Sequence, residues 1–120
     1  MSNARDIADA GHQLVAWVNF NGSASDSSFT IANNGIRNAF NVSSVSNVTT
    51  GNYKIQFETD LSNDDYCFVG SAYNATNTNV YYAVGFVQVP SKTEFYVYVY
   101  DFAGSPTDVL YVYCAFFNKE

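Results

Sequence analysis

Apolar and polar residues alternate with a period of two along most of the chain from residue 14 onward. Such alternation is typical of β-strands, because successive side chains point to opposite faces of a sheet. Gly, Asn, Ser and Pro separate the alternating segments, as turns do. The pattern predicts strands over residues 14–20, 29–32, 40–45, 53–59, 66–73, 80–89, 94–102 and 109–117. We therefore predict an all-β fold, an antiparallel β-sandwich of about eight strands, with a barrel as the related alternative.

The N-terminal segment departs from this pattern. Residues 1–13 are polar and are typical of a helical turn or two, which Ser2 or Asn3 could cap and Gly11 could end. A helix this short is marginal unless it packs on another surface. We interpret residues 1–13 as an arm or tether and residues 14–120 as the β-sandwich domain, since no repeat or long linker marks a second domain.

Two C-terminal strands carry apolar or amphipathic side chains on both faces. In residues 94–102, one face has Phe95, Val97 and Val99, and the other has Tyr96, Tyr98, Tyr100 and Phe102. In residues 109–117, one face has Leu110, Val112, Cys114 and Phe116, and the other has Val109, Tyr111, Tyr113, Ala115 and Phe117. One face of each strand can fill the core. The second face must then be shielded from water by some other contact.

Three kinds of contact could bury such a row of tyrosines. A subunit interface is one, because aromatic residues are enriched there. Burial by another part of the same chain is the second, and an open platform for a sugar ring is the third. We favour the interface, because a domain of this size leaves much of its surface unburied and a large exposed apolar patch would aggregate. The predicted interface residues are Tyr96, Tyr98, Tyr100, Tyr111 and Tyr113.

Composition narrows the class of protein. The chain has 120 residues, with 48% hydrophobic, 18% aromatic and 13% charged residues, so it can bury a core. The net charge of −6 and the few, scattered basic residues disfavour a nucleic-acid partner or an anionic membrane surface. No apolar run reaches the ~20 residues of a membrane span. The polar start of the chain is unlike a signal peptide.

Candidate chemistry is sparse. We predict that Cys67 and Cys114 are free thiols, because no secretory signal points to an oxidising compartment. His12 is the single histidine and lies outside the predicted strands, which disfavours it as a catalytic base. The acidic residues Asp60, Asp64 and Asp65 fit a polar turn better than a calcium loop. The spacing of the carboxylates singles out no glycosidase pair, and we expect no cofactor and no enzymatic activity.

Four ordered blocks of sequence resemble one family. Residues 16–22 read Ala-Trp-Val-Asn-Phe-Asn-Gly, and residues 37–45 read Arg-Asn-Ala-Phe-Asn-Val-Ser-Ser-Val. Residues 51–59 read Gly-Asn-Tyr-Lys-Ile-Gln-Phe-Glu-Thr, and an Asp-Asp-Tyr turn at 64–66 precedes Val-Gly-Ser-Ala at 69–72. Together they are similar to the C-terminal domain of bacteriophage tail fibres, a domain common in phages of marine cyanobacteria. The segment 4–9 also resembles the sequence that precedes this domain in some fibres.

The resemblance implies a virion structural protein, assembled in the cytoplasm of a bacterial host, whose copies associate as a homotrimer. It implies core positions for Trp17 and Phe20 and turns at Gly22 and Gly51, and it carries over no catalytic residue. Because little sequence precedes residue 14, either a fibre fragment or a stand-alone capsid decoration is consistent with it. We expect Arg5, Asp6 and Ile7 to attach the protein to other virion proteins, and the loops at 23–28, 74–79 and 103–107 to face solvent or a host-surface glycan. A carbohydrate-binding module is the alternative function.

Overall fold

The computed structural model describes residues 13–24, 35–74, 79–85 and 91–118, and these residues form an all-β fold. The strands are β1 (Gln13–Phe20), β2 (Ile36–Phe40), β3 (Val42–Thr49), β4 (Asn52–Phe57), β5 (Cys67–Tyr73), β6 (Tyr81–Gly85), β7 (Glu94–Asp101) and β8 (Tyr111–Asn118). They form one antiparallel sheet in the order β2-β1-β8-β5-β6-β7-β4-β3. The predicted fold class is confirmed.

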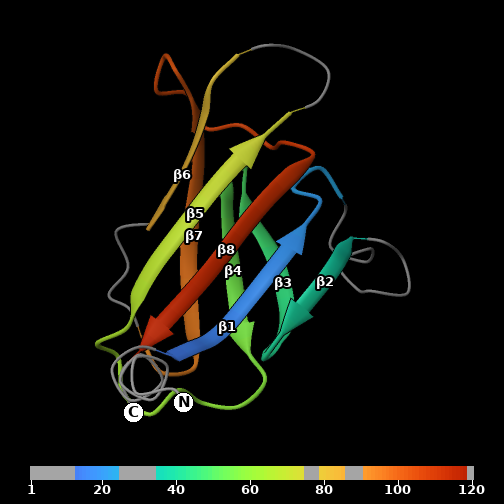
Figure 1. The fold of residues 1–120 in the computed structure, drawn as a ribbon. Helices are drawn as coiled ribbons and strands as arrows, with labels where there is room; N and C mark the ends of the chain where they lie inside the picture. The colour runs from blue at the N-terminus through green and yellow to red at the C-terminus, as the bar shows by residue number, and fades with distance from the viewer. Residues whose placement is uncertain (1–12, 25–34, 75–78, 86–90, 119–120) are drawn as a thin grey trace, which may run out of the picture.

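The sheet folds over on itself into two layers (Figure 1), with β2, β1, β8 and β5 in one layer and β6, β7, β4 and β3 in the other. One corner lies between β5 and β6, which share a single register pair, Ala72 with Tyr81. The other corner is Asn41, the one residue between β2 and β3. The two edge strands therefore follow each other in the chain, and the fold lies between a sandwich and a flattened barrel.

Asn41 turns the chain from one layer to the other. Its φ of 56° lies in the left-handed region, which asparagine tolerates better than most residues. Its side-chain amide donates to the carbonyl of Val15 at 3.1 Å, and its Oδ1 accepts from the backbone N–H of Thr59 at 2.7 Å. The prediction of one strand over residues 40–45 was therefore wrong, because a strand break at Asn41 divides that segment between β2 and β3.

The core lies between the two layers and follows the period of two. Every second side chain of β1, β4, β7 and β8 is buried there, so the predicted inward set Phe95, Val97 and Val99 is confirmed. Rings cluster at one end, where Phe116 contacts Phe57 at 5.2 Å and Phe95 at 5.1 Å between centroids. Edge-to-face pairs of this kind add to the stability that burial alone provides.

A cluster of hydrogen-bonded polar groups lies at the other end of the core. The Tyr53 hydroxyl lies 2.7 Å from both the carbonyl of Gly22 and Oδ1 of Asp108, and Asp108 also accepts from the backbone N–H of Gly51 at 2.8 Å. Burial, together with the carboxylate of Asp108, raises the pKa of Tyr53 well above its ordinary value. A Cβ on Gly22 would lie 2.6 Å from the Tyr53 hydroxyl, so this position requires glycine.

Trp17 is not a core residue, contrary to the expectation from the resemblance. Its neighbours Ala16 and Val18 are buried at 0% and 1% exposure, and alternation turns Trp17 to the outer surface of the sheet, where it is half-buried. Phe20, in contrast, is fully buried as expected, and Gly51 has the positive φ of 73° that its turn needs.

Several predictions fall outside the described residues. The arm with Arg5, Asp6 and Ile7, the histidine at position 12 and the strand predicted over residues 29–32 lie there. The strand predicted over 80–89 corresponds to β6, and residues 86–89 are outside the described part. The first strand starts at Gln13, one residue before the predicted domain boundary.

Candidate functional site

The outer surface of one layer is the first candidate, and we call it the β8 face. It consists of the outward-pointing side chains of β2, β1, β8 and β5. Strand register places these side chains in rows across the layer, one of which joins Trp17, Ala115 and Val69. A second row joins Asn19, Tyr113 and Ser71. Rows of paired side chains form a continuous surface across neighbouring strands.

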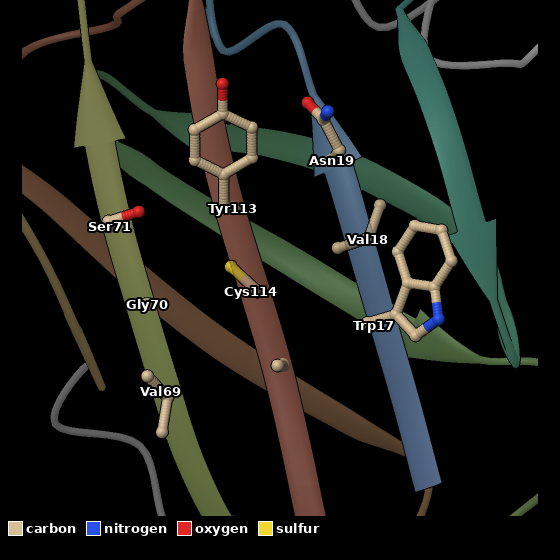
Figure 2. Close-up of a pocket in the computed structure, with 9 residues that line it drawn as sticks. Trp17, Val18, Asn19, Val69, Gly70, Ser71, Tyr113 and Cys114 are labelled. Carbon is tan, nitrogen blue, oxygen red and sulfur yellow. The ribbon is translucent and has the colours of Figure 1, made fainter. Parts of the chain in front are cut away.

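A hollow of about 400 Å³ lies in the middle of the β8 face. Its lining residues come from the adjacent strands β1, β8 and β5, and they are Trp17, Val18, Asn19, Val69, Gly70, Ser71, Tyr113, Cys114 and Ala115. Figure 2 shows the ring of Tyr113 over β8 and the ring of Trp17 beside β1, both with a broad face turned outward. The small side chain of Ala115, which points outward between Trp17 and Val69, leaves space there. The hollow can accept an apolar or flat group.

Large apolar side chains surround this hollow and remain exposed. They have between 36% and 60% of their surface accessible, and they are Leu14, Phe40, Val69, Tyr73, Tyr113 and Phe117. Monomeric proteins rarely leave so many large apolar side chains together on one surface. The β8 face thus has the character of a contact surface.

The β8 face is almost free of charge. Arg37 is the one charged residue in β2, β1, β8 and β5, and its own contacts hold it. Its guanidinium donates to the carbonyl of Leu110 at 2.6 Å and to Oδ1 of Asn19 at 3.2 Å, and lies 4.1 Å from the ring centroid of Tyr111. Arg37 is therefore a fixed part of the surface at its edge.

The outer surface of the other layer is different, and we call it the β7 face. It consists of the outward-pointing side chains of β6, β7, β4 and β3. Here Tyr100 stacks on Tyr82 with a centroid distance of 5.2 Å and on Tyr98 with a distance of 5.3 Å. The strands that form this face also carry Lys54, Glu94 and Asp101. The β7 face combines a stacked row of tyrosines with charged groups.

The five predicted interface tyrosines do not form one surface. Tyr96, Tyr98 and Tyr100 lie on the β7 face, whereas Tyr111 and Tyr113 lie on the β8 face, on the opposite side of the molecule. Sequence reasoning missed Trp17 and Phe40 as surface residues. The alternation in residues 14–20 already contained the signal for Trp17, because it places Trp17 on the face opposite Ala16, Val18 and Phe20.

The remaining candidate residues stay apart. Cys67 is exposed, Cys114 is buried, and both are free thiols, as predicted. Burial raises the pKa of the Cys114 thiol. Glu94 and Asp101 lie at opposite ends of β7, roughly 23 Å apart along the strand, and do not form a carboxylate pair. Within the described residues, no three His, Cys, Asp or Glu side chains gather as metal ligands would.

The described part of the chain also contains no helix of the length and apolarity that crossing a membrane requires. Comparison of the sequence with protein-family models and with curated proteins, and of the structure with solved structures, gives no match. The candidate site therefore rests on the residues and their geometry.

Proposed function

We propose that this chain is a non-enzymatic structural protein of a bacteriophage virion, a tail-fibre-like protein or a capsid decoration, that works as an oligomer. The β8 face carries this proposal, because a surface with exposed rings and a single charged residue suits permanent contact with another protein. The resemblance of the four sequence blocks to tail-fibre domains supports the virion setting.

The positions of the block residues in the fold are consistent with this reading. One group, which includes Val18, Phe20, Tyr53, Ile55 and Phe57, is buried in the core. A second group forms corners and turns, as Asn41 and Gly51 do. A third group contributes nothing to the core and lies on the β8 face: Trp17, Asn19, Phe40, Val69 and Ser71. The blocks thus describe a fold together with one of its surfaces.

In this proposal the protein works by forming contacts that bury surface, and it catalyses no reaction. Copies associate, as a trimer if the family resemblance holds, and an arm that includes Arg5, Asp6 and Ile7 attaches them to the capsid or tail. The loops at the ends of the sandwich are then available for a host surface, since recognition commonly lies in loops on a rigid scaffold.

Labelling of particles tests the virion role. Antibodies against the purified protein, applied with gold conjugates to purified particles of the phage that encodes it, are expected to decorate one recurring position on the capsid or tail. Mass spectrometry of the same particles should find the chain in a fixed ratio to the major capsid protein. A chain that is abundant in infected cells and missing from purified particles would overturn the proposal.

A carbohydrate-binding module is the second candidate, and one observation favours it. The open ring faces of Trp17 and Tyr113 resemble a platform for a sugar, with Asn19 and Ser71 alongside to form hydrogen bonds. The lining of the hollow is mainly apolar and includes no carboxylate, so it offers few groups to bind sugar hydroxyls. A monomer in solution whose Trp17 fluorescence changes on titration with host-surface glycans would favour this function.

A further inference from the structure

We infer that the β8 face is the surface on which a second copy of this chain packs, with exposed side chains of one copy filling the hollow of the other. The inference deepens the oligomeric part of the proposed function by naming the partner and the surface. It assigns the contact to Tyr111, Tyr113 and their neighbours, and it leaves Tyr96, Tyr98 and Tyr100 outside the contact.

The exposed area is of the size that self-association needs. Six large apolar side chains of the β8 face have exposed fractions from 36% to 60%. With about 200 Å² for each large side chain, they present roughly 550 Å² of apolar surface per copy. Covering that surface on two copies removes roughly 1,100 Å² from water, which reaches the ~1,000 Å² expected of a specific interface.

The charge distribution permits contact between copies on this face and disfavours a partner recruited by charge. The chain has a net charge of −6, so two copies repel each other wherever acidic residues meet. The strands of the β8 face contain no Asp or Glu, and their one cation, Arg37, already contacts Leu110, Asn19 and Tyr111. Two β8 faces that meet over the hollow can therefore pack without burying a carboxylate or an uncompensated cation, because the nearby carboxylates of Glu58 and Asp60 lie at the end of the layer beside Phe40. A partner recruited by charge would find no group on this face to bind.

The shape of the β8 face is complementary to itself. It combines a hollow with protruding side chains, among which Phe40 is 51% exposed, Val69 is 60% exposed and Tyr73 is 55% exposed. When a surface with both features meets other copies of itself, each copy can supply the group that fills the hollow of its neighbour, either in a pair or around a three-fold axis. Aromatic anchors seated in apolar hollows are the contacts that dominate interface energies.

The β7 face also exposes large side chains, with Tyr82 at 44% and Val84 at 37%, but it combines them with stacked rings and charged groups. Tyr100 stacks on both Tyr82 and Tyr98, so these rings already have partners within the chain, although Tyr82 remains 44% exposed. Glu94, Asp101 and Lys54 belong to the same layer and favour contact with water. Tyr98 and Tyr100 thus already have ring contacts within their own chain.

Two matched valine variants test the inference. Val69 and Val84 are both exposed, at 60% and 37%, and point outward from β5 and β6 in opposite layers. Light scattering coupled to size exclusion should give a wild-type mass that is a multiple of the chain mass. Val69→Asp should weaken association by at least about 30-fold, the factor that corresponds to burying an unpaired charge. Val84→Asp, the control, should leave the dissociation constant unchanged within about threefold, as a surface change does.

Further outcomes separate this inference from the virion role. Circular dichroism checks that both variants fold, and Phe40→Asp on the edge strand β2 replaces Val69→Asp if that variant is insoluble. A wild-type protein that stays monomeric, or an oligomer that only Val84→Asp dissociates, overturns the inference. So does a monomer that binds glycans through Trp17. None of these results bears on particle labelling, which decides the virion role by itself.

Discussion

The two outer faces of this fold carry the same residue type in two different settings. On the β7 face, Tyr82, Tyr100 and Tyr98 stack at 5.2 and 5.3 Å, and the middle ring has a neighbour on each side. On the β8 face, Tyr113 is 6.3 Å from Tyr111, and its broad face is turned outward beside the hollow (Figure 2). A tyrosine whose ring is already covered stabilises its own chain, whereas one with an open ring beside an apolar hollow can contact another molecule.

The difference extends to charge. The strands of the β7 face contain Lys54, Glu94 and Asp101, so water can solvate that surface around its tyrosines. The strands of the β8 face contain Arg37 alone, and the contacts of this residue are satisfied within the chain. Aromatic content therefore says less about function than the partners of each ring and the charges beside it.

Two alanine variants give the strongest test of the difference between the two faces. Tyr100→Ala removes two stacked ring contacts, so we expect it to lower the free energy of unfolding by about 1–3 kcal/mol. Tyr113→Ala removes one longer contact and should cost less than about 1 kcal/mol. Urea unfolding followed by circular dichroism measures both, in a Val69→Asp background so that association does not contribute. Equal costs for the two variants would contradict the separation of the faces.

In the otherwise wild-type chain, the same two substitutions should affect association in the opposite order. Tyr113→Ala should raise the dissociation constant of the oligomer about tenfold, as loss of a typical interface contact does, and Tyr100→Ala should leave it unchanged. Sedimentation velocity over a range of protein concentrations provides this readout. Weaker association of Tyr100→Ala alone would place the contact on the β7 face.

Replacing Arg37 sharpens the comparison within the β8 face. Arg37→Met keeps an apolar stem but removes the charge, the donor to the Leu110 carbonyl at 2.6 Å and the cation over Tyr111. We expect the free energy of unfolding to fall by about 1–3 kcal/mol. Association should persist, because Arg37 supports the face from its edge. Loss of association with stability intact would instead show that Arg37 binds the partner directly.

Thiol reactivity gives the smallest and most local effect. Cys67 is exposed on the β8 face opposite Phe117, whereas Cys114 is buried and its pKa is raised. At pH 8 in dilute native protein, iodoacetate should modify Cys67 alone, and Cys114 should react only after unfolding. The rate at Cys67 should fall as the protein concentration passes through the association range. A modification rate at Cys67 that does not depend on protein concentration would show that no second copy covers this end of the β8 face.

Much of the fold could be predicted from the sequence because it depends on local alternation. The period of two predicted a strand over residues 53–59, which corresponds to β4, and its alternate side chains Tyr53, Ile55 and Phe57 are all buried. The break at Asn41 was missed, because a single residue with φ of 56° interrupts no hydrophobic pattern. Trp17 was misplaced because the family resemblance implied a core position, although the alternation of its neighbours placed it outside.

The candidate site was less predictable because it depends on strand order. Alternation shows that Tyr98 and Tyr113 both point away from the core, but not that β7 and β8 belong to opposite layers. That arrangement follows from pairings between strands far apart in the sequence, such as β1 with β8 and β4 with β7. The hollow likewise needs Trp17 from β1 and Gly70 from β5 to lie on either side of β8.

The fluorescence of Trp17 tests the central claim most directly. It is the one tryptophan of the chain and lies on the β8 face beside the hollow, so its emission reports on that surface alone. Acrylamide quenching measured from dilute to concentrated protein, with Val69→Asp as the monomer reference, should show Trp17 becoming less accessible and its emission moving to shorter wavelength as the molar mass rises. Equal quenching of Trp17 in the wild-type oligomer and in the Val69→Asp monomer would contradict the claim that copies of the chain cover this face.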